Sequence, residues 1–295
     1  MFAGVHTALV TPFTGPAHGI DADAFCSLID RQFEGKVSGV VPVGTTGESP
    51  TLSHEEHIRV IELTVQHTAG RGLVIAGTGS NSTDEAIRLT QAAEQAGADA
   101  ALLVAPYYNK PSQEGLFQHY RLIAEATDLP LMLYSIPGRC GIAIEVETVA
   151  RLAAECSNIR AIKEAGGSAE RVSALKAALP DEFEILSGDD SLTLPFMSVG
   201  AVGVVSVASN LIPSVMSDLV QAMHEGRLAH AQALHRQYYP LCSGFLKLDT
   251  NPVPIKTALS LAGKCDAELR LPMVGMTDDM TAELRSILES LGLLS

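Results

Sequence analysis

The feature that most constrains the fold is a regular alternation of short β-branched runs with amphipathic helical patterns. A run of four to eight apolar residues between turn signals is typical of a buried strand. Eight such runs occur, and they are GVHTALV (4–10), GVVPV (39–43), GLVIAG (72–77), AALLVA (100–105), LPLMLY (129–134), IRAIKEA (159–165), FEILSG (183–188) and VGVVSV (202–207). Between them, Ser53 with Glu56 and Ser82 with Glu85 form predicted capping boxes, and Gly97 is a predicted helix stop.

Eight strand and helix units in succession predict a parallel (β/α)8 barrel, the TIM barrel. A doubly wound sheet is the alternative, but no Gly-x-Gly-x-x-Gly turn follows the first run. Residues 211–295 show only helical patterns. We therefore expect a catalytic barrel domain over residues 1–210 and a C-terminal helical extension over residues 211–295.

The charge of the chain limits the partners that it can have. Its formal net charge is -14 and its pI is about 5.0, so nucleic acid and anionic membranes would repel it. Five scattered cysteines without a Cys-x-x-Cys pair are typical of a reduced compartment. No run approaches the length of a membrane span, and the first residues lack a signal-peptide pattern. We expect a cytoplasmic protein.

Polar residues gather just past the predicted strands, where the active sites of such barrels lie. These residues are Thr45, Thr46, Tyr107, Tyr108, Tyr134, Arg139, Lys163, Gly188, Asp189 and Ser206. By strand alternation Ile159, Ala161 and Lys163 share one face, so an ammonium points where small apolar residues point. Burial favours the neutral amine, which attacks carbonyl groups and forms a Schiff base.

Two structural alternatives for this lysine are open. Lys163 is either a surface residue on a misassigned element or one half of a buried ion pair with Glu164. Tyr134, at the end of the preceding strand, favours the catalytic interpretation, because a phenol can move the protons that imine chemistry requires.

Three other motifs give weaker signals. GTTGES (44–49) lacks the Lys-Ser/Thr ending of a nucleotide loop, although its N–H groups and hydroxyls can hold a carboxylate. SGDD (187–190) suits a divalent ion, as in metal-dependent aldolases, but no other carboxylate or histidine at a strand end completes a shell. HEEH (54–57) misses the zinc spacing His-Glu-x-x-His, and its plain interpretation is a solvated first helical turn.

Together these motifs resemble the dihydrodipicolinate synthase family, pyruvate-dependent Schiff-base aldolases whose wider group includes N-acetylneuraminate lyase. The resemblance runs from residue 1 to past LRLPM near residue 273. It is carried by GTTGES, AGTGSNST, PYYNKPSQEGL, LYSIPGR, IKEAGG, SGDD, GVVSVASN and NPVPIK.

The resemblance implies a condensation of pyruvate with L-aspartate 4-semialdehyde to 4-hydroxy-tetrahydrodipicolinate, in the diaminopimelate route of lysine biosynthesis, with no metal or organic cofactor. Lys163 would form the Schiff base. The implied proton relay consists of Tyr134, Thr45 and Tyr108, the last supplied by a neighbouring subunit. The implied substrate residues are Thr45 and Thr46 for the pyruvate carboxylate, Arg139 for the carboxylate of the aldehyde, and Gly188 and Val205 through their backbone groups.

The resemblance also implies a homotetramer, a dimer of dimers, with allosteric inhibition by L-lysine. The implied lysine site consists of Ser49, His54, His57, Asn81, Glu85 and Tyr107. Pro50 departs from the alanine common in the family and borders that site, while Ser135 and Cys140 depart from the pattern beside Tyr134 and Arg139.

Two other functions are open. One is a pyruvate aldolase that acts on another aldehyde, such as N-acetylmannosamine. The other is a non-catalytic ligand-binding relative. This alternative is disfavoured because the chain keeps all four implied catalytic residues, Lys163, Tyr134, Thr45 and Tyr108.

Overall fold

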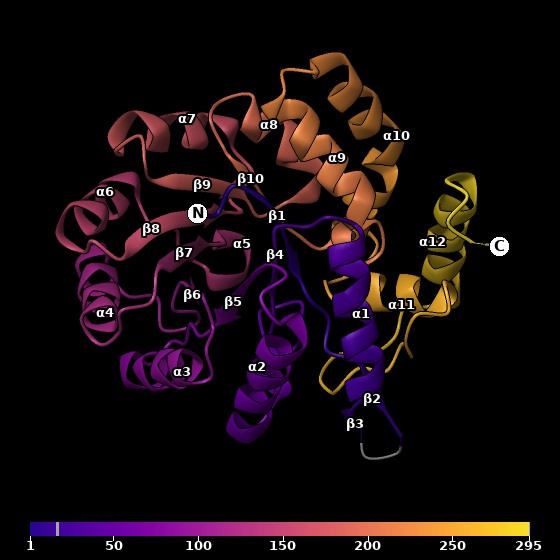
Figure 1. Ribbon diagram of the computed structural model, residues 1–295, viewed down its shortest axis with the longest axis horizontal. Coiled ribbons are helices and arrows are strands. Elements are labelled where there is room, and N and C mark those ends of the chain that lie inside the picture. The colour runs from indigo at the N-terminus through magenta and orange to yellow at the C-terminus, as the bar shows by residue number, and fades with distance from the viewer. Residues whose placement is uncertain (16–17, 295) are drawn as a thin grey trace.

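The computed structural model describes residues 1–15 and 18–294 and contains a closed barrel of parallel strands (Figure 1). The strands follow chain order around the barrel, and β1 closes it by pairing with both β4 and β10. The barrel strands are β1 (Gly4–Ala8), β4 (Gly39–Val41), β5 (Leu73–Gly77), β6 (Ala100–Val104), β7 (Leu131–Ser135), β8 (Ile159–Glu164), β9 (Glu184–Ser187) and β10 (Gly203–Ser206). The predicted (β/α)8 barrel is confirmed, with each strand at one of the eight runs.

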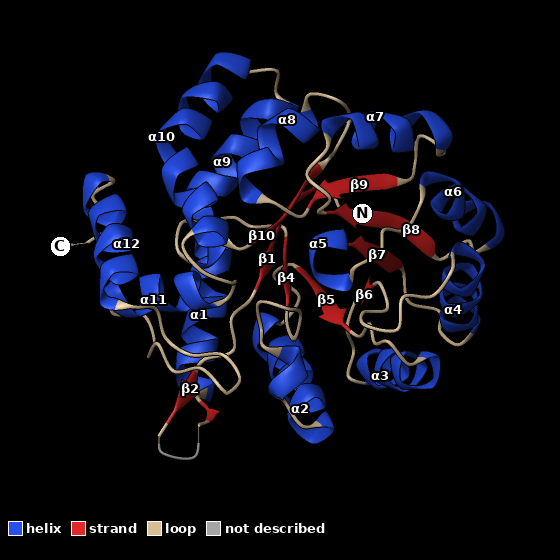
Figure 2. Ribbon diagram, turned by 180° about the vertical axis from the view of Figure 1, so that it is seen from behind, coloured by secondary structure: helices blue, strands red, loops and turns tan. Residues whose placement is uncertain are grey.

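Helices surround the strands on all sides, and the last ones lie together beside one part of the barrel (Figures 1 and 2). They are α1 (Ala22–Glu34), α2 (His54–Thr68), α3 (Thr83–Gln95), α4 (Gln113–Glu125), α5 (Pro137–Cys140), α6 (Val146–Glu155), α7 (Ala169–Ala178), α8 (Thr193–Met197), α9 (Pro213–His224), α10 (Leu228–Lys247), α11 (Val253–Leu261) and α12 (Asp278–Ser290). Short 3-10 turns are η1 (Ser49–Thr51), η2 (Asp190–Leu192) and η3 (Ala208–Asn210).

The helix ends follow the predicted signals with one exception. Ser53 and Glu56 form the capping box of α2, and α3 ends just before Gly97, whose φ is 89°. Ser82 caps α3 through the N–H of Glu85, but the Glu85 carboxylate does not return the bond and binds His54 and Ser80 instead. The Glu85 carboxylate therefore contacts side chains outside its own helix and does not cap α3.

The core has two layers because successive strand residues point to opposite faces. The inner layer fills the barrel with Ala8, Val41, Ile75, Leu102, Met132, Ala161, Leu186 and Val205. The outer layer packs strands against helices, for example Leu131, Ile159, Ile162 and Ile185. The barrel interior is therefore packed largely with apolar side chains, together with the fully buried His6 of β1.

Strand β8 departs from simple alternation. Leu131 of β7 pairs with Ile159, but Met132 pairs with Ala161, so the register shifts by one residue at Arg160. Ile159 consequently packs in the outer layer, while Ala161 lies in the inner layer. The expectation that Ile159 shares a face with Lys163 is wrong, because the extra residue reverses the phase between them.

Two further differences concern the ends of the chain. A hairpin of β2 (Phe13–Thr14) and β3 (Gly19–Ile20) was not expected, since strands of two residues show no alternation. Residues 262–277, between α11 and α12, contain no helix, so the purely helical prediction for residues 211–295 is wrong there. The domain division after residue 210 stays a prediction, and residues 16–17 and 295, which its ranges include, lie outside the described residues.

All five cysteines are free thiols. In residues 1–15 and 18–294 no helix combines the length and apolar character needed to cross a membrane.

Candidate active site

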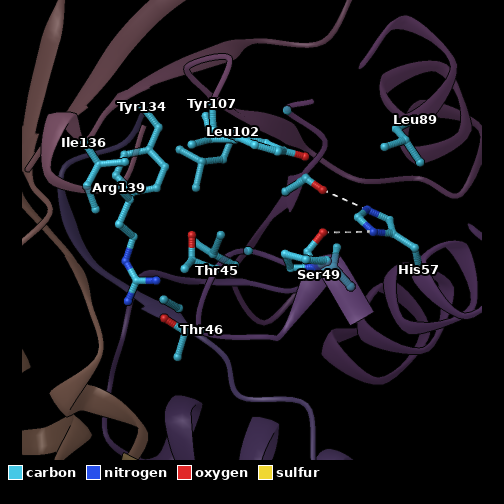
Figure 3. A pocket seen from close by; sticks show the side chains of 18 of the residues that line it. Thr45, Thr46, Ser49, His57, Leu89, Leu102, Tyr107, Tyr134, Ile136 and Arg139 are labelled. Atoms are coloured by element: carbon cyan, nitrogen blue, oxygen red, sulfur yellow. Dashed lines mark hydrogen bonds between the residues drawn. The ribbon is translucent and has the colours of Figure 1, made fainter. Parts of the chain in front are cut away.

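A cavity of about 370 Å³ opens at the carboxyl ends of the barrel strands. Most of the sequence-predicted polar residues meet there, because parallel strands end on the same side. Figure 3 shows Tyr134 and Arg139 at one end of the cavity, Ser49 and His57 at the other, and Thr45 between them.

Lys163 ends the inward face of β8 and is 5% exposed. Burial lowers the pKa of its ammonium to about 7, with the charge of Asp190 opposing that shift and the charge of Arg139 adding to it. In the described part of the chain no carboxylate lies within salt-bridge distance of Lys163. A large fraction of this lysine is therefore the neutral, nucleophilic amine near neutral pH.

Glu164 points to the opposite side of β8. Its carboxylate accepts hydrogen bonds from Arg171 Nε at 2.8 Å and from the N–H of Gly166 at 2.7 Å. Glu164 is fully buried in this arrangement. Both structural alternatives for Lys163 are thereby excluded, since Lys163 is neither on the surface nor paired with Glu164.

Tyr134 lies beside Lys163 on the neighbouring strand. The two residues are register partners, and Lys163 Nζ lies 4.1 Å from the centre of the phenol ring. Burial raises the pKa of the Tyr134 phenol, with Arg139 and the Thr45 hydroxyl among the groups that oppose the shift. The phenol therefore stays protonated and can donate a proton to a reacting oxygen.

The loop after β4 places Thr45 and Thr46 at the cavity wall. The N–H groups of Gly47 and Ser49 bind the carbonyl of Gly44, which closes the loop into a tight turn. Thr45 is partly exposed to the cavity, while Thr46 is buried and its Oγ1 accepts a hydrogen bond of 3.0 Å from Asn251 Nδ2. Two adjacent threonine hydroxyls on this tight turn form an arrangement that can donate hydrogen bonds to a carboxylate.

Arg139 extends from α5 into the same cavity. Its Nη2 donates a hydrogen bond of 2.8 Å to the carbonyl of Asn251, so the backbone of one residue holds the guanidinium and its side chain holds Thr46. Asn251 belongs to the NPVPIK motif, but no role was predicted for it. Its contact with Thr46 joins positions 205 residues apart, so no local pattern in the sequence indicates it.

Gly188 lies next to Lys163, and Val205 lies in the inner layer of the barrel. A Cβ atom at Gly188 would lie 3.1 Å from Lys163 Cε and 2.7 Å from the Cβ of Ala165. Val205 is buried in the inner layer of the barrel together with Tyr134. Neither residue lines the open cavity, so the structure shows no direct exposure of Gly188 or Val205 to a ligand in that cavity.

Tyr108 is separate from the other relay residues. Its side chain is 91% exposed, and its φ of 74° holds it in the left-handed region. The adjacent Tyr107 lines the cavity instead. This backbone conformation is unusual for a bulky non-glycine residue. It directs the Tyr108 side chain outward, away from its own chain.

Five of the six residues expected for an inhibitor site line the cavity, and these are Ser49, His54, His57, Glu85 and Tyr107. His57 Nε2 donates to the carbonyl of Gly77 at 2.8 Å, and Ser49 Oγ lies 3.4 Å from Nδ1. Burial lowers the pKa of His57, so the neutral ring donates through Nε2 and accepts through Nδ1. The expectation of a solvated HEEH turn is wrong for this histidine, which is buried.

His54 and Glu85 line that end of the cavity, whereas Asn81 lies outside its lining. His54 Nε2 lies 2.8 Å from Glu85 Oε1, and Glu85 also accepts from Ser80 Oγ. Asn81 Nδ2 donates to the carbonyl of Tyr107 at 3.1 Å. This second cluster shares one continuous cavity with Lys163.

The two aspartates of SGDD have structural partners. Asp189 caps η2 by accepting from Ser191, and Asp190 Oδ2 accepts from the N–H groups of Val207 and Ala208 at 2.9 and 2.8 Å. Burial raises the pKa of Asp190 to about 6, although the Ser206 hydroxyl and these N–H groups oppose the shift. No effect on Lys163 was predicted for Asp190, although its charge raises the pKa of that lysine.

The same motif is also a sequence candidate for a divalent ion. Within residues 1–15 and 18–294, no three His, Cys, Asp or Glu side chains are grouped so that they could hold a metal ion.

The chain is similar to proteins of one known family over nearly its whole length. Residues 1–291 match the profile of the dihydrodipicolinate synthetase family. The 4-hydroxy-tetrahydrodipicolinate synthase of Endomicrobium trichonymphae is 49% identical over 294 residues, which is 100% of each protein.

Two solved structures extend the comparison to ligand complexes. Chloride-inhibited dihydrodipicolinate synthase from Acinetobacter baumannii, complexed with pyruvate, is 41% identical with a TM-score of 0.97, and the match covers 100% of both chains. The enzyme from Cyanidioschyzon merolae with lysine bound is 41% identical with a TM-score of 0.96, and the match covers 99% of both chains.

Proposed function

The chain belongs to the dihydrodipicolinate synthetase family, and from that premise we propose that it condenses pyruvate with L-aspartate 4-semialdehyde to 4-hydroxy-tetrahydrodipicolinate. The single observation that carries the proposal is Lys163. It is a buried lysine with a pKa of about 7 at the carboxyl end of a barrel strand, beside the phenol of Tyr134. The relatives that are named as this synthase support the choice of the two substrates.

The reaction proceeds by covalent catalysis at this amine. The Lys163 nitrogen adds to the keto carbon of pyruvate, and loss of water gives an iminium. Loss of a proton from the pyruvate methyl group gives an enamine, whose carbon attacks the aldehyde and forms the new C–C bond. The amino group of the second substrate then attacks the iminium carbon, closes the ring and releases the lysine amine.

The surrounding residues bind and move protons. Thr45 and Thr46 hold the pyruvate carboxylate, while the Tyr134 phenol passes protons to and from the carbinolamine oxygen. Arg139 binds the carboxylate of L-aspartate 4-semialdehyde through a charge-assisted, bidentate pair. Gly188 and Val205 border the pyruvate from below through their backbone groups.

Borohydride trapping tests the first half of this mechanism. We expect pyruvate with borohydride to inactivate the enzyme and to add one reduced pyruvate at Lys163, located by peptide mass mapping. Lys256 is a matched internal control, because it is also buried but is ion-paired with Glu48. Labelling at Lys256, or no labelling, contradicts the mechanism.

A substrate comparison tests the second half. With pyruvate present, L-aspartate 4-semialdehyde should be consumed at a rate far above that of N-acetylmannosamine. Preference for the sugar would leave the Schiff base in place and overturn the assignment of the second substrate.

We further propose that the active unit is a homotetramer built as a dimer of dimers. The outward position and left-handed backbone of Tyr108 support the dimer within this tetramer, because the phenol points away from the relay of its own chain. Sedimentation velocity at working concentrations should give a tetramer, and a monomer with full activity would refute the shared relay.

The cluster at the far end of the cavity is proposed as an allosteric site for L-lysine. Glu85 offers a carboxylate to an ammonium group, and Ser49, His54, His57, Asn81 and Tyr107 offer polar contacts. The relative from Cyanidioschyzon merolae with lysine bound supports lysine as the ligand. Pro50, which lines the same cavity, stiffens its edge.

Titration of L-lysine against initial rate tests the site. We expect inhibition in the native enzyme and a large loss of sensitivity in Glu85→Gln. Glu62→Gln on the exposed face of α2 is the matched control and should respond as the native enzyme does. Equal sensitivity in all three proteins would refute the assignment.

A further inference from the structure

The turn that carries Thr45 and Thr46 ends at Glu48, and this residue is unusual in two ways. Its φ of 55° and ψ of 36° lie in the left-handed region, which costs free energy for any residue with a side chain. Its N–H binds the carbonyl of Thr45 at 3.2 Å. The conformation of Glu48 therefore directly determines the position of the threonine turn.

The Glu48 side chain is buried, 3% exposed, and both carboxylate oxygens are occupied. Oε1 accepts a hydrogen bond of 2.6 Å from Lys256 Nζ, and Oε2 accepts one of 3.1 Å from the backbone N–H of Arg270. Both partners are more than 200 residues away along the chain, as the separations of 208 and 222 show. The turn is thus attached to the C-terminal part of the chain.

Lys256 is fully buried in α11 and is held on several sides. Besides Glu48, its ammonium donates to the carbonyl of Thr11 at 2.9 Å and lies 4.3 Å from the centre of the Phe13 ring. Thr11 in turn donates through Oγ1 to the carbonyl of Gly47 at 2.7 Å. Lys256 therefore fixes both sides of the same turn.

A purely stabilising role explains these contacts poorly. Replacing a buried ion pair by apolar side chains is often neutral or stabilising, so burial of two charges is a weak source of stability. A buried pair does specify geometry, because each charge requires its partner at one distance and direction. Here the geometry specified is that of the residues proposed to hold pyruvate.

We propose that Glu48 and Lys256 are positioning residues for pyruvate: their ion pair holds the 44–48 turn, and so Thr45 and Thr46, in the binding geometry. The inference rests on the proposed function at Lys163. It makes the C-terminal segment part of the catalytic unit, since α11 supplies the lysine.

The test measures the pyruvate concentration that gives half-maximal borohydride trapping of Lys163. Glu48→Gln and Lys256→Met keep the shape of each side chain but break the pair. Each should raise that concentration by about tenfold or more, the scale expected when a binding group is misplaced by about an ångström. At saturating pyruvate, the KM for the aldehyde should change far less.

The double variant Glu48→Gln/Lys256→Met separates positioning from stability. With both charges removed, it should melt near the native temperature while pyruvate trapping stays weakened. Because the two residues act as one unit, its effect on trapping should equal that of either single variant rather than their product. If a single variant does not fold, pyruvate trapping in the double variant still shows whether the ion pair positions the turn.

Leu116→Ala is the matched control for lost stability. Leu116 is fully buried in α4 and packs in a different hydrophobic cluster from Val43 and Leu52, which flank the turn. Its truncation should therefore lower the melting temperature and leave half-maximal trapping unchanged. Native half-maximal trapping in the folded double variant would overturn the inference. No trapping in the native enzyme would instead overturn the proposed function, so the two failures are distinguishable.

Discussion

Lys163 Nζ lies 4.1 Å from the ring centre of Tyr134, its register partner on the neighbouring strand. The aromatic face favours the charged ammonium, yet burial dominates and lowers the pKa of Lys163 to about 7. The amine is therefore balanced between its charged and neutral forms, and the phenol lies where a reaction at that amine needs a proton.

Tyr134→Phe should reduce kcat by about 10²-fold or more, which is the usual scale for loss of a positioned proton donor. The ring and its packing remain, so the melting temperature should change little. Slow borohydride trapping of pyruvate should persist, because Lys163 is intact. Steady-state rates with a thermal melt on the same sample check this, and an unchanged kcat would remove Tyr134 from the relay.

Lys163→Met should abolish activity and make the fold more stable. The native pKa of about 7 lies below the unfolded value of 10.5, so the unfolded chain binds more protons between these values. This lysine therefore destabilises the native enzyme fully below pH 7, and the penalty fades as the pH rises to 10.5.

The stability gain of Lys163→Met should accordingly be a few kcal/mol near pH 6, on the order of 1.4 kcal/mol per pKa unit, and should vanish near pH 10.5. Denaturant titrations of both proteins across this range check the sign. A gain that grows with pH would contradict the buried, destabilised amine.

Arg139→Ala should leave the pyruvate adduct intact and impair use of the second substrate. A charge-assisted hydrogen bond contributes about 1.5–3 kcal/mol, which corresponds to roughly ten- to a hundredfold in kcat/KM for the aldehyde. Arg139→Lys should recover only part of this, since an ammonium cannot bind a carboxylate bidentately. Equal trapping by pyruvate in all three proteins is the internal control.

Much of this arrangement follows from local sequence. The eight strands, the end position of Lys163 and its neighbour Tyr134 follow from alternation and strand order, because those signals span only a few residues. The contacts of Asn251 and Lys256 with the GTTGES turn do not, since they join segments more than 200 residues apart. No periodicity within a window of the chain reveals such a pairing.

Mixing two inactive variants tests whether Tyr108 acts in a neighbouring subunit. Lys163→Ala lacks the nucleophile and Tyr108→Phe lacks the outer phenol. If the relay crosses an interface, subunit exchange between them should restore a fraction of native activity, because some mixed pairs contain one intact site. Self-mixed samples of each variant are the controls, and activity that never rises above theirs would place the relay within one chain.

Gly188→Ala should slow adduct formation, because the new methyl group would lie 3.1 Å from Lys163 Cε. Crowding of this kind costs about 1–3 kcal/mol and displaces the flexible neighbour. Gly275→Ala is the matched control, since a Cβ atom at that position would meet nothing within 4 Å. Equal trapping rates in the two variants would show that the Lys163 side chain does not need the space left by the missing side chain of Gly188.

The one-residue register shift at Arg160 divides β8 into two parts. Inward and outward side chains alternate within each part, but the alternation does not continue across the shift. Before it, Ile159 faces the helices; after it, Ala161 and Lys163 face the barrel interior while Glu164 is anchored to Arg171. Removing the exposed Arg160 would restore even alternation and keep Lys163 inward, whereas removing Ile162 would rotate the nucleophile out of the cavity. We therefore expect the enzyme to stay active when Arg160 is deleted and to lose activity when Ile162, two positions further along the same strand, is deleted.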